Sequence, residues 1–192
     1  MNRQDYISDS ENNSDIYFDY ISQEQDIIQK IKVSCPVILF MYSGKLTIRY
    51  KSEQISAKKG ECIFIQANTI VTFHTSKNDE ESFCGIYVGF SQSFLSEFYH
   101  DVYDKRIMQE RGELPIGVMK MPCTPYMQSL YISMVPYLEQ KTKPEKNLME
   151  LKRQECIYCM LTSDSRFYSS LFAFIKPIEQ EFFYLINKPS LN

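Results

Sequence analysis

Residues 37–74 read VILFMYSGKLTIRYKSEQISAKKGECIFIQANTIVTFH, and they carry the clearest structural signal in the chain. In it, short apolar runs alternate with turn sequences: Ser43-Gly44-Lys45, KKGE at 58–61 and ANT at 67–69. A glycine between two such runs is typical of a tight hairpin, because glycine adopts a positive φ without steric cost. The stretch therefore predicts a series of short antiparallel strands.

The run that follows Gly44 has the clearest strand pattern. Leu46, Ile48 and Tyr50 share one face, while the other face carries Lys45, Thr47, Arg49 and Lys51. This alternation predicts a strand with one face in the core and one in water. Similar runs occur at 16–21, 27–34 and 83–90. Many short strands separated by turns at a spacing of roughly 8–12 residues favour a sandwich or barrel.

The periodicity becomes helical after Phe90. Ser91 is a suitable N-cap, and Thr124-Pro125 combines a capping residue with proline at the first helical position. Further helices are expected at 147–162, 167–175 and 178–186, and Pro136 should kink or end the helix that contains it. Residues 106–122, with several glycines and prolines, are expected to be mostly loop. The predicted class is α+β, mainly β and then α: a flexible polar arm (1–15), a small β-barrel (16–90), a helical region (91–176) and the start of a linker (177–192).

Composition excludes several classes of protein. The chain has 21 Lys and Arg against 24 Asp and Glu, a net charge of −3, so it lacks the basic surplus of a nucleic-acid-binding domain. No apolar run approaches the roughly 18–20 residues of a membrane span. The polar N-terminus is unlike a signal peptide, so a cytoplasmic location is expected and the six cysteines are expected to be free thiols.

Groups that could perform catalysis are scarce. The two histidines, His74 and His100, are too far apart in sequence to form a metal-binding motif. Cys156 and Cys159 match C-x-x-C, but they lie inside a predicted helix among apolar residues, which favours buried structural thiols. The sequence contains no phosphate-binding glycine loop and no nucleophile elbow. We therefore predict no catalytic residues, no metal and no cofactor.

Aromatic side chains along the strands suggest a second possibility, a ligand pocket. A barrel just wide enough for a side-chain core can instead hold one small molecule. Simple core packing is the alternative for each of these residues, and Phe90 belongs to the same group. Lys32 or Arg49 could anchor a ligand, although Arg49 lies on the polar face of its strand. The predicted pocket residues are Phe40, Tyr42, Tyr50, Phe64, Phe73, Tyr87 and Lys32.

Several of these motifs, taken in order, resemble the sensor half of AraC-family transcription regulators. They are the apolar strand before Gly44, the Gly60-Glu61 turn into an apolar strand, and Phe90-Ser91 with Phe94-Leu95 leading into a helix. The segment LMELKRQECIYCMLTSDSRFYSSLF at 148–172 is similar to the helices that follow the barrel in that family. The resemblance covers roughly residues 16–176 and implies a cupin-type barrel. It departs from the family where the helix-turn-helix half would begin, since the chain stops in INKPSLN.

The resemblance implies a non-enzymatic domain that binds an effector and forms a homodimer. The effector would be a small apolar or aromatic molecule or a regulatory protein, and DNA would be bound only through the missing C-terminal domain. Such a domain has no membrane contact. The residues that we predict for the dimer interface, or alternatively for the core, are Met127, Leu130, Met134, Leu148 and Leu151.

Two other hypotheses remain open at this stage. One is a metal-independent cupin-like enzyme, for example an isomerase or epimerase. Such an enzyme would need a base in the barrel, and His74 is the only imidazole in the β region. The other is a small-molecule-binding module such as a sugar-binding domain, with aromatic and polar residues on an open sheet.

Overall fold

The structure is a computed structural model that describes residues 18–23, 26–76, 82–101, 117–139 and 145–175. The predicted arm (1–15), the predicted last helix (178–186) and the predicted linker (177–192) therefore lie outside the described residues. In the described part, the strands are β1 (Phe18–Gln23), β2 (Ile27–Val33), β3 (Val37–Ser43), β4 (Lys45–Tyr50), β5 (Glu53–Lys58), β6 (Cys62–Ile65), β7 (Thr69–Ser76), β8 (Phe83–Gly89) and β9 (Val118–Met121). The helices are α1 (Gln92–Asp101), α2 (Pro125–Glu139), α3 (Lys146–Ser163) and α4 (Phe167–Phe172).

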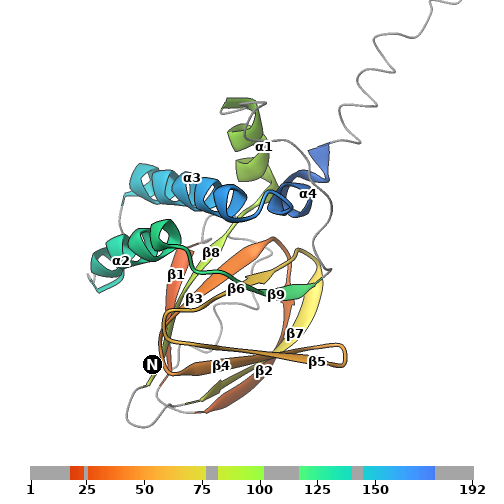
Figure 1. The fold of residues 1–192 in the computed structure, drawn as a ribbon, viewed down its shortest axis with the longest axis vertical. Coiled ribbons are helices and arrows are strands. Elements are labelled where there is room, and N and C mark those ends of the chain that lie inside the picture. Colours follow the sequence, from red (N-terminus) through yellow and green to blue (C-terminus); the bar gives the residue numbers. More distant parts are fainter. Residues whose placement is uncertain (1–17, 24–25, 77–81, 102–116, 140–144, 176–192) are drawn as a thin grey trace, which may run out of the picture.

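The strands form two antiparallel sheets that enclose a small barrel (Figure 1). Sheet A has the order β1-β8-β3-β6-β9, and sheet B has the order β2-β7-β4-β5. The expected fold class, a β-barrel followed by helices, is confirmed. Gly44 joins β3 to β4 with a φ of +70°, as its hairpin position predicts. A Cβ at this residue would lie 2.7 Å from the Cα of Phe83, so a side chain does not fit there.

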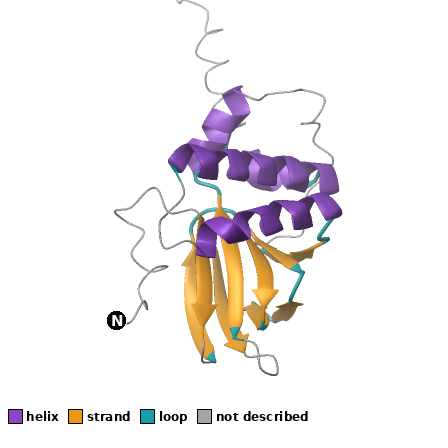
Figure 2. Ribbon diagram, turned by 90° about the vertical axis from the view of Figure 1, so that its left-hand side faces the viewer, coloured by secondary structure: helices purple, strands orange, loops and turns teal. Residues whose placement is uncertain are grey.

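The central strands of sheet A, β3, β6 and β8, are largely buried on both faces. The inner face of the sheet contributes to the barrel interior, an apolar cluster whose buried members are Val33, Leu39, Met41, Leu46, Ile48, Ala57, Ile63, Ile65, Val71, Phe83 and Val118. Its outer face, with Ile38, Phe40, Phe64, Ile86 and Val88, packs against the helices in a second cluster. The helices form a layer on one side of the barrel, with α2 and α3 side by side (Figure 2).

The helix starts confirm the capping predictions. The backbone N–H of Phe94 donates to Ser91 Oγ at 3.2 Å, and that of Met127 donates to Thr124 Oγ1 at 3.3 Å. Such bonds satisfy backbone donors that have no partner within the first turn of a helix. Helix α3, which carries the C-x-x-C pair, ends at the predicted break around Asp164.

One prediction needs correction. The segment expected to be loop contains β9, which pairs with β6 in the register Cys62↔Met121 to Ile65↔Val118, so the barrel is completed by residues beyond Phe90. Pro136 lies in the last turn of α2, which ends at Glu139, in agreement with the expectation that the helix would end near this proline.

Candidate functional site

The barrel interior is the candidate site, and it is lined mainly by aliphatic side chains. Tyr50, Phe73 and Tyr87 come from three different strands, are half-buried, and pack against this interior cluster. These three residues were predicted to line a pocket, and the structure directs all three toward the barrel interior. The barrel interior is an apolar cluster with half-buried aromatic rings packed against it, and this composition suits an apolar ligand.

Phe40 and Phe64, also predicted to line the pocket, point the other way. The Phe40 ring stacks on Tyr131 of α2, with centroids 4.3 Å apart, and the Phe64 ring meets Phe167 of α4 edge-on at 5.1 Å. Phe90 is fully buried in the same layer between sheet A and the helices. All three residues belong to the interface between barrel and helices, so they do not contact the barrel interior.

The remaining predicted pocket residues are exposed. Lys32 lies on the outer face of sheet B, and Tyr42 is 39% exposed at the end of β3. Arg49 is also exposed, as its place on the polar face of its strand indicated. Neither Lys32 nor Arg49 can anchor a ligand inside the barrel.

Sequence reasoning missed the closure of the barrel next to Tyr50. Gly117, which has a φ of +110°, exchanges two hydrogen bonds with Gln66: its N–H donates to Gln66 Oε1 at 3.1 Å, and its carbonyl accepts from the Gln66 N–H at 2.8 Å. The Tyr50 ring lies directly on this glycine, so close that an ideal Cβ would fall 2.1 Å from the ring. Lys51 follows, with its Nζ 5.0 Å from the centre of the Tyr50 ring. This places a cation beside a half-buried aromatic residue of the candidate site.

His74 does not have the surroundings that catalysis requires. It lies on the outer face of sheet B, where its partners in the register are Ile28 and Thr47. Its neighbour Phe73 takes the inward position. A general base at this place would face away from the barrel interior. In the described residues, no group of three His, Cys, Asp or Glu side chains is arranged to hold a metal ion.

The predicted interface residues separate into two groups. One group lies on the buried face of α2 and consists of Met127, Leu130 and Met134. These are core residues, which the sequence analysis gave as the alternative to a dimer interface. Leu148 is half-buried, and Leu151 is 59% exposed on α3. On α2, the exposed apolar residues are Tyr126 and Ile132. The helical layer thus presents apolar side chains to the outside, mostly at positions that the periodicity did not single out.

Arg153 of α3 connects the barrel to two helices. Its Nε donates to the carbonyl oxygen of Gly89 at 3.1 Å, at the end of β8. Its guanidinium lies 3.7 Å from the ring centre of Phe94 in α1, a cation–π contact. The side chain is buried, so these contacts fix α3 against the junction between barrel and α1.

No helix in the described part of the chain is long and apolar enough to cross a membrane.

The comparisons with known proteins agree with this architecture. The model of the ExsA N-terminal regulatory domain family, which is an AraC-type family, matches residues 36–170. No curated protein sequence matches the chain.

Among solved structures, the fold is similar to that of ToxT from Vibrio cholerae. Apo ToxT K231A of strain SCE256 matches with a TM-score of 0.59 and 12% identity, over 81% of this chain and 57% of that one. Wild-type ToxT of the same strain with bound unsaturated fatty acid matches with a TM-score of 0.57 and 14% identity, over 84% of this chain and 58% of that one. ToxT of strain O395 bound to (E)-4-(8-methylnaphthalen-1-yl)but-3-enoic acid matches with a TM-score of 0.54 and 13% identity, over 81% of this chain and 58% of that one. The chain thus spans less than two thirds of the length of these ToxT chains.

Proposed function

Since the chain belongs to the family of the ExsA N-terminal regulatory domain, we propose that it is the effector-sensing and dimerisation domain of an AraC-type transcription regulator. In this proposal the domain is not an enzyme, acts in the cytoplasm and forms a homodimer. Binding of an effector changes the DNA-binding activity of a separate C-terminal domain, through which alone the regulator contacts DNA.

The proposal rests mainly on the two faces of sheet A. In β3, Leu39 and Met41 belong to the barrel interior, while Ile38 and Phe40 pack under the helices. A ligand that displaces Leu39 or Met41 must therefore move the strand on which α2 packs. Close packing transmits such a shift, because interiors contain few voids that could absorb it. The helical layer then changes its population of states in favour of those that accommodate the ligand.

The chemistry of the site favours a monocarboxylic acid with an apolar tail. The aliphatic interior suits the tail. Lys51 is exposed in the turn after β4, but its Nζ lies beside the half-buried Tyr50 ring at the edge of the interior, where it offers a cation for a carboxylate at the surface. ToxT, whose fold is similar, has been solved with an unsaturated fatty acid and with an aryl-butenoic acid, both of this class. A protein effector that docks outside the barrel is the alternative, and the experiment below separates the two.

The test is calorimetric titration of the purified domain with oleate below its micelle concentration. We expect saturable 1:1 binding, weakened about two- to fivefold in Lys51→Ala, because an ion pair made by an exposed lysine contributes about 0.5–1 kcal/mol. The matched control is Lys32→Ala, which removes an exposed lysine from the outer face of sheet B and should leave affinity unchanged. Absence of oleate binding, or equal losses in both variants, would contradict the proposed effector class.

A further inference from the structure

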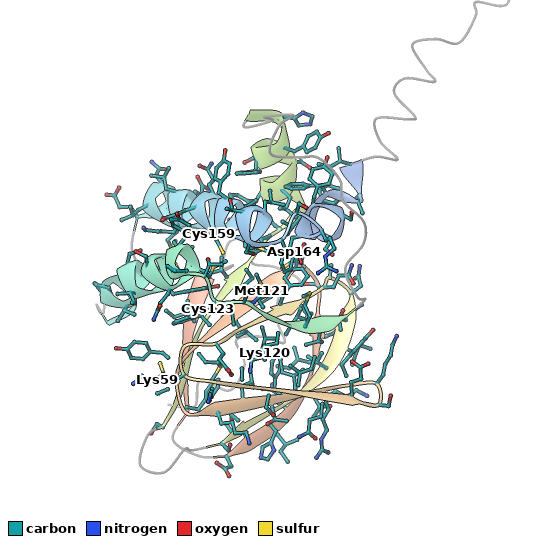
Figure 3. All side chains as sticks on the ribbon, viewed as in Figure 1. Lys59, Lys120, Met121, Cys123, Cys159 and Asp164 are labelled. Atoms are coloured by element: carbon teal, nitrogen blue, oxygen red, sulfur yellow. The ribbon has the colours of Figure 1, made fainter. Side chains whose placement is uncertain are left out.

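The outer face of sheet B lies on the side of the barrel opposite to the helical layer, and no described helix covers it (Figure 1). Its side chains project away from the barrel interior (Figure 3). Five exposed basic residues from β2, β4 and β5 share this surface, which we call the basic face: Lys30, Lys32, Lys45, Arg49 and Lys58. Because the whole chain has a net charge of −3, this surface is opposite in charge to the molecule that carries it.

The strand register brings these cations together. Residues that stand directly opposite each other in an antiparallel pair project to the same face of the sheet. Thr72 of β7 stands opposite Lys30 on one side and Arg49 on the other. Lys45 of β4 stands opposite Lys58 of β5. The five residues therefore form one continuous surface to which three strands contribute.

Among the described residues of these four strands, no acidic side chain lies on the basic face. The one acidic residue of the strands is Glu53, which stands opposite Tyr50 and so shares the side of the sheet that faces the barrel interior. A lysine of β9 is paired differently: Lys120 Nζ lies 2.7 Å from Glu61 Oε1 (Figure 3). Within the described part of the chain, no ion pair of this kind involves the cations of the basic face.

Protection of a sheet edge accounts for only part of this charge. Lysines on an edge strand prevent pairing with another chain, and β2 is an edge strand of sheet B, so Lys30 and Lys32 fit this role. Lys45 and Arg49 do not, because β4 lies inside the sheet between β7 and β5. The basic face therefore carries more charge than edge protection requires.

Two exposed isoleucines lie among the cations. Ile28 is 71% exposed and Ile70 is 53% exposed, and both project from the same face as Lys30 and Lys32. Protein interfaces combine apolar anchors of this kind with surrounding charges. The phosphate backbone of a nucleic acid would pair with the cations but leave the isoleucines in water, and the net charge of the chain opposes association with a polyanion. The composition therefore favours an acidic protein segment.

We propose that the basic face, together with Ile28 and Ile70, is the docking surface for an acidic segment of a partner protein. The segment carries Asp or Glu side chains for the cations and at least two apolar side chains for the isoleucines. Four strands spaced by about 4.8 Å make the face about 15 Å wide, a distance that an extended segment of about six residues crosses. This inference goes beyond the proposed function: it uses neither the barrel interior nor the helical layer, and it stands whether or not oleate binds.

Fluorescence anisotropy of the whole chain with a labelled synthetic peptide tests the proposal. The probe is a peptide of about ten residues in which Asp or Glu alternates with Ile or Leu. We expect saturable binding that weakens as the salt concentration rises, because salt screens the attraction between charges. Arg49→Glu reverses a charge in the middle of the basic face and should weaken binding about tenfold or more. Lys146→Glu makes the same charge change on an exposed lysine of α3, and should leave binding unchanged.

Two further probes separate the apolar from the electrostatic contribution. A peptide with Ser in place of Ile and Leu should bind about threefold or more weakly, because it cannot bury Ile28 and Ile70. Duplex DNA, which offers charge without apolar side chains, should also bind more weakly than the acidic peptide.

Absence of peptide binding, or equal losses in Arg49→Glu and Lys146→Glu, would overturn the proposal. Tighter binding of the duplex than of the peptide would overturn it as well, since the basic face would then be a nucleic-acid surface. Lys30→Glu repeats the test from β2 at another exposed position, so the outcome does not depend on the folding of a single variant.

Discussion

Gly117 has no side chain because Tyr50 occupies the space that one would need. The Tyr50 ring packs on the glycine backbone, and the φ of +110° at Gly117 is one that other residues rarely adopt. The same glycine is tied to Gln66 by two hydrogen bonds. One residue thus sets the position of an aromatic ring in the candidate site.

The variant Gly117→Ala tests this role, with Gly60→Ala as its control. Gly60 also has a positive φ, +82°, but no atom lies within 4 Å of the Cβ it would gain. Gly60→Ala should therefore cost only the backbone strain of about 1–2 kcal/mol. Gly117→Ala should cost about 1–3 kcal/mol more, because Tyr50 must leave its place. Urea denaturation measures both, and equal losses would contradict the packing described for Tyr50.

At the scale of elements, sheet A is the structure that both clusters share. Its inner face belongs to the barrel interior and its outer face to the helical layer, so β6 and the Ile38–Met41 part of β3 are buried on both faces. The contact between Phe40 and Tyr131 is the aromatic stack that joins β3 to α2. Burial of the Tyr131 hydroxyl raises the pKa of Tyr131 well above its usual value, which keeps the residue neutral.

A double-mutant cycle between Phe40→Leu and Tyr131→Leu measures this contact. The stacked rings should give a coupling energy of about 0.5–1.5 kcal/mol, obtained from urea unfolding of the two single variants and the double variant. Phe40→Leu combined with Phe172→Leu is the control, because Phe172 stacks on Phe98 in another part of the layer. Equal coupling energies in the two cycles would contradict a specific stacking contact between Phe40 of β3 and Tyr131 of α2.

The sequence predicted elements better than it predicted faces. Turns, caps and the order of strands and helices follow from local signals such as Gly44, Ser91 and Thr124. The direction of Phe40 and Phe64 does not, because β3 and β6 are apolar at every buried position and show no alternation to read. In β4, where one face is wet, the inward place of Tyr50 was predicted correctly. The sequence analysis missed strand β9 because its four residues, between Gly117 and Pro122, are too few to show a strand periodicity. The strand forms because it pairs with β6, which is distant in sequence.

At the scale of the whole molecule, we propose that two subunits associate through the helical layer. The exposed apolar residues Ile132 and Leu151 lie on α2 and α3, away from the barrel interior. Of the five residues that the sequence predicted for the dimer interface, Leu151 is the exposed one.

Dimerisation through this layer predicts different outcomes for two matched variants. Leu151→Glu should raise the dimer dissociation constant about tenfold or more, because a charge would be buried in an apolar contact. Ile28→Glu changes an apolar residue on sheet B that is even more exposed, 71% against 59% for Leu151, and should leave the constant unchanged. Sedimentation velocity over a concentration series measures both. A larger effect of Ile28→Glu would place the interface on sheet B.

We propose that the barrel interior and the helical layer respond together through sheet A when an effector binds. Amide hydrogen exchange with and without saturating oleate tests it most directly, because protection reports the local opening of each element. We predict slower exchange in β3 and β4, where the ligand would bind, and also in α2 and α3, which contact no ligand. Protection confined to the strands, with unchanged helices, would contradict the coupling between barrel and helical layer.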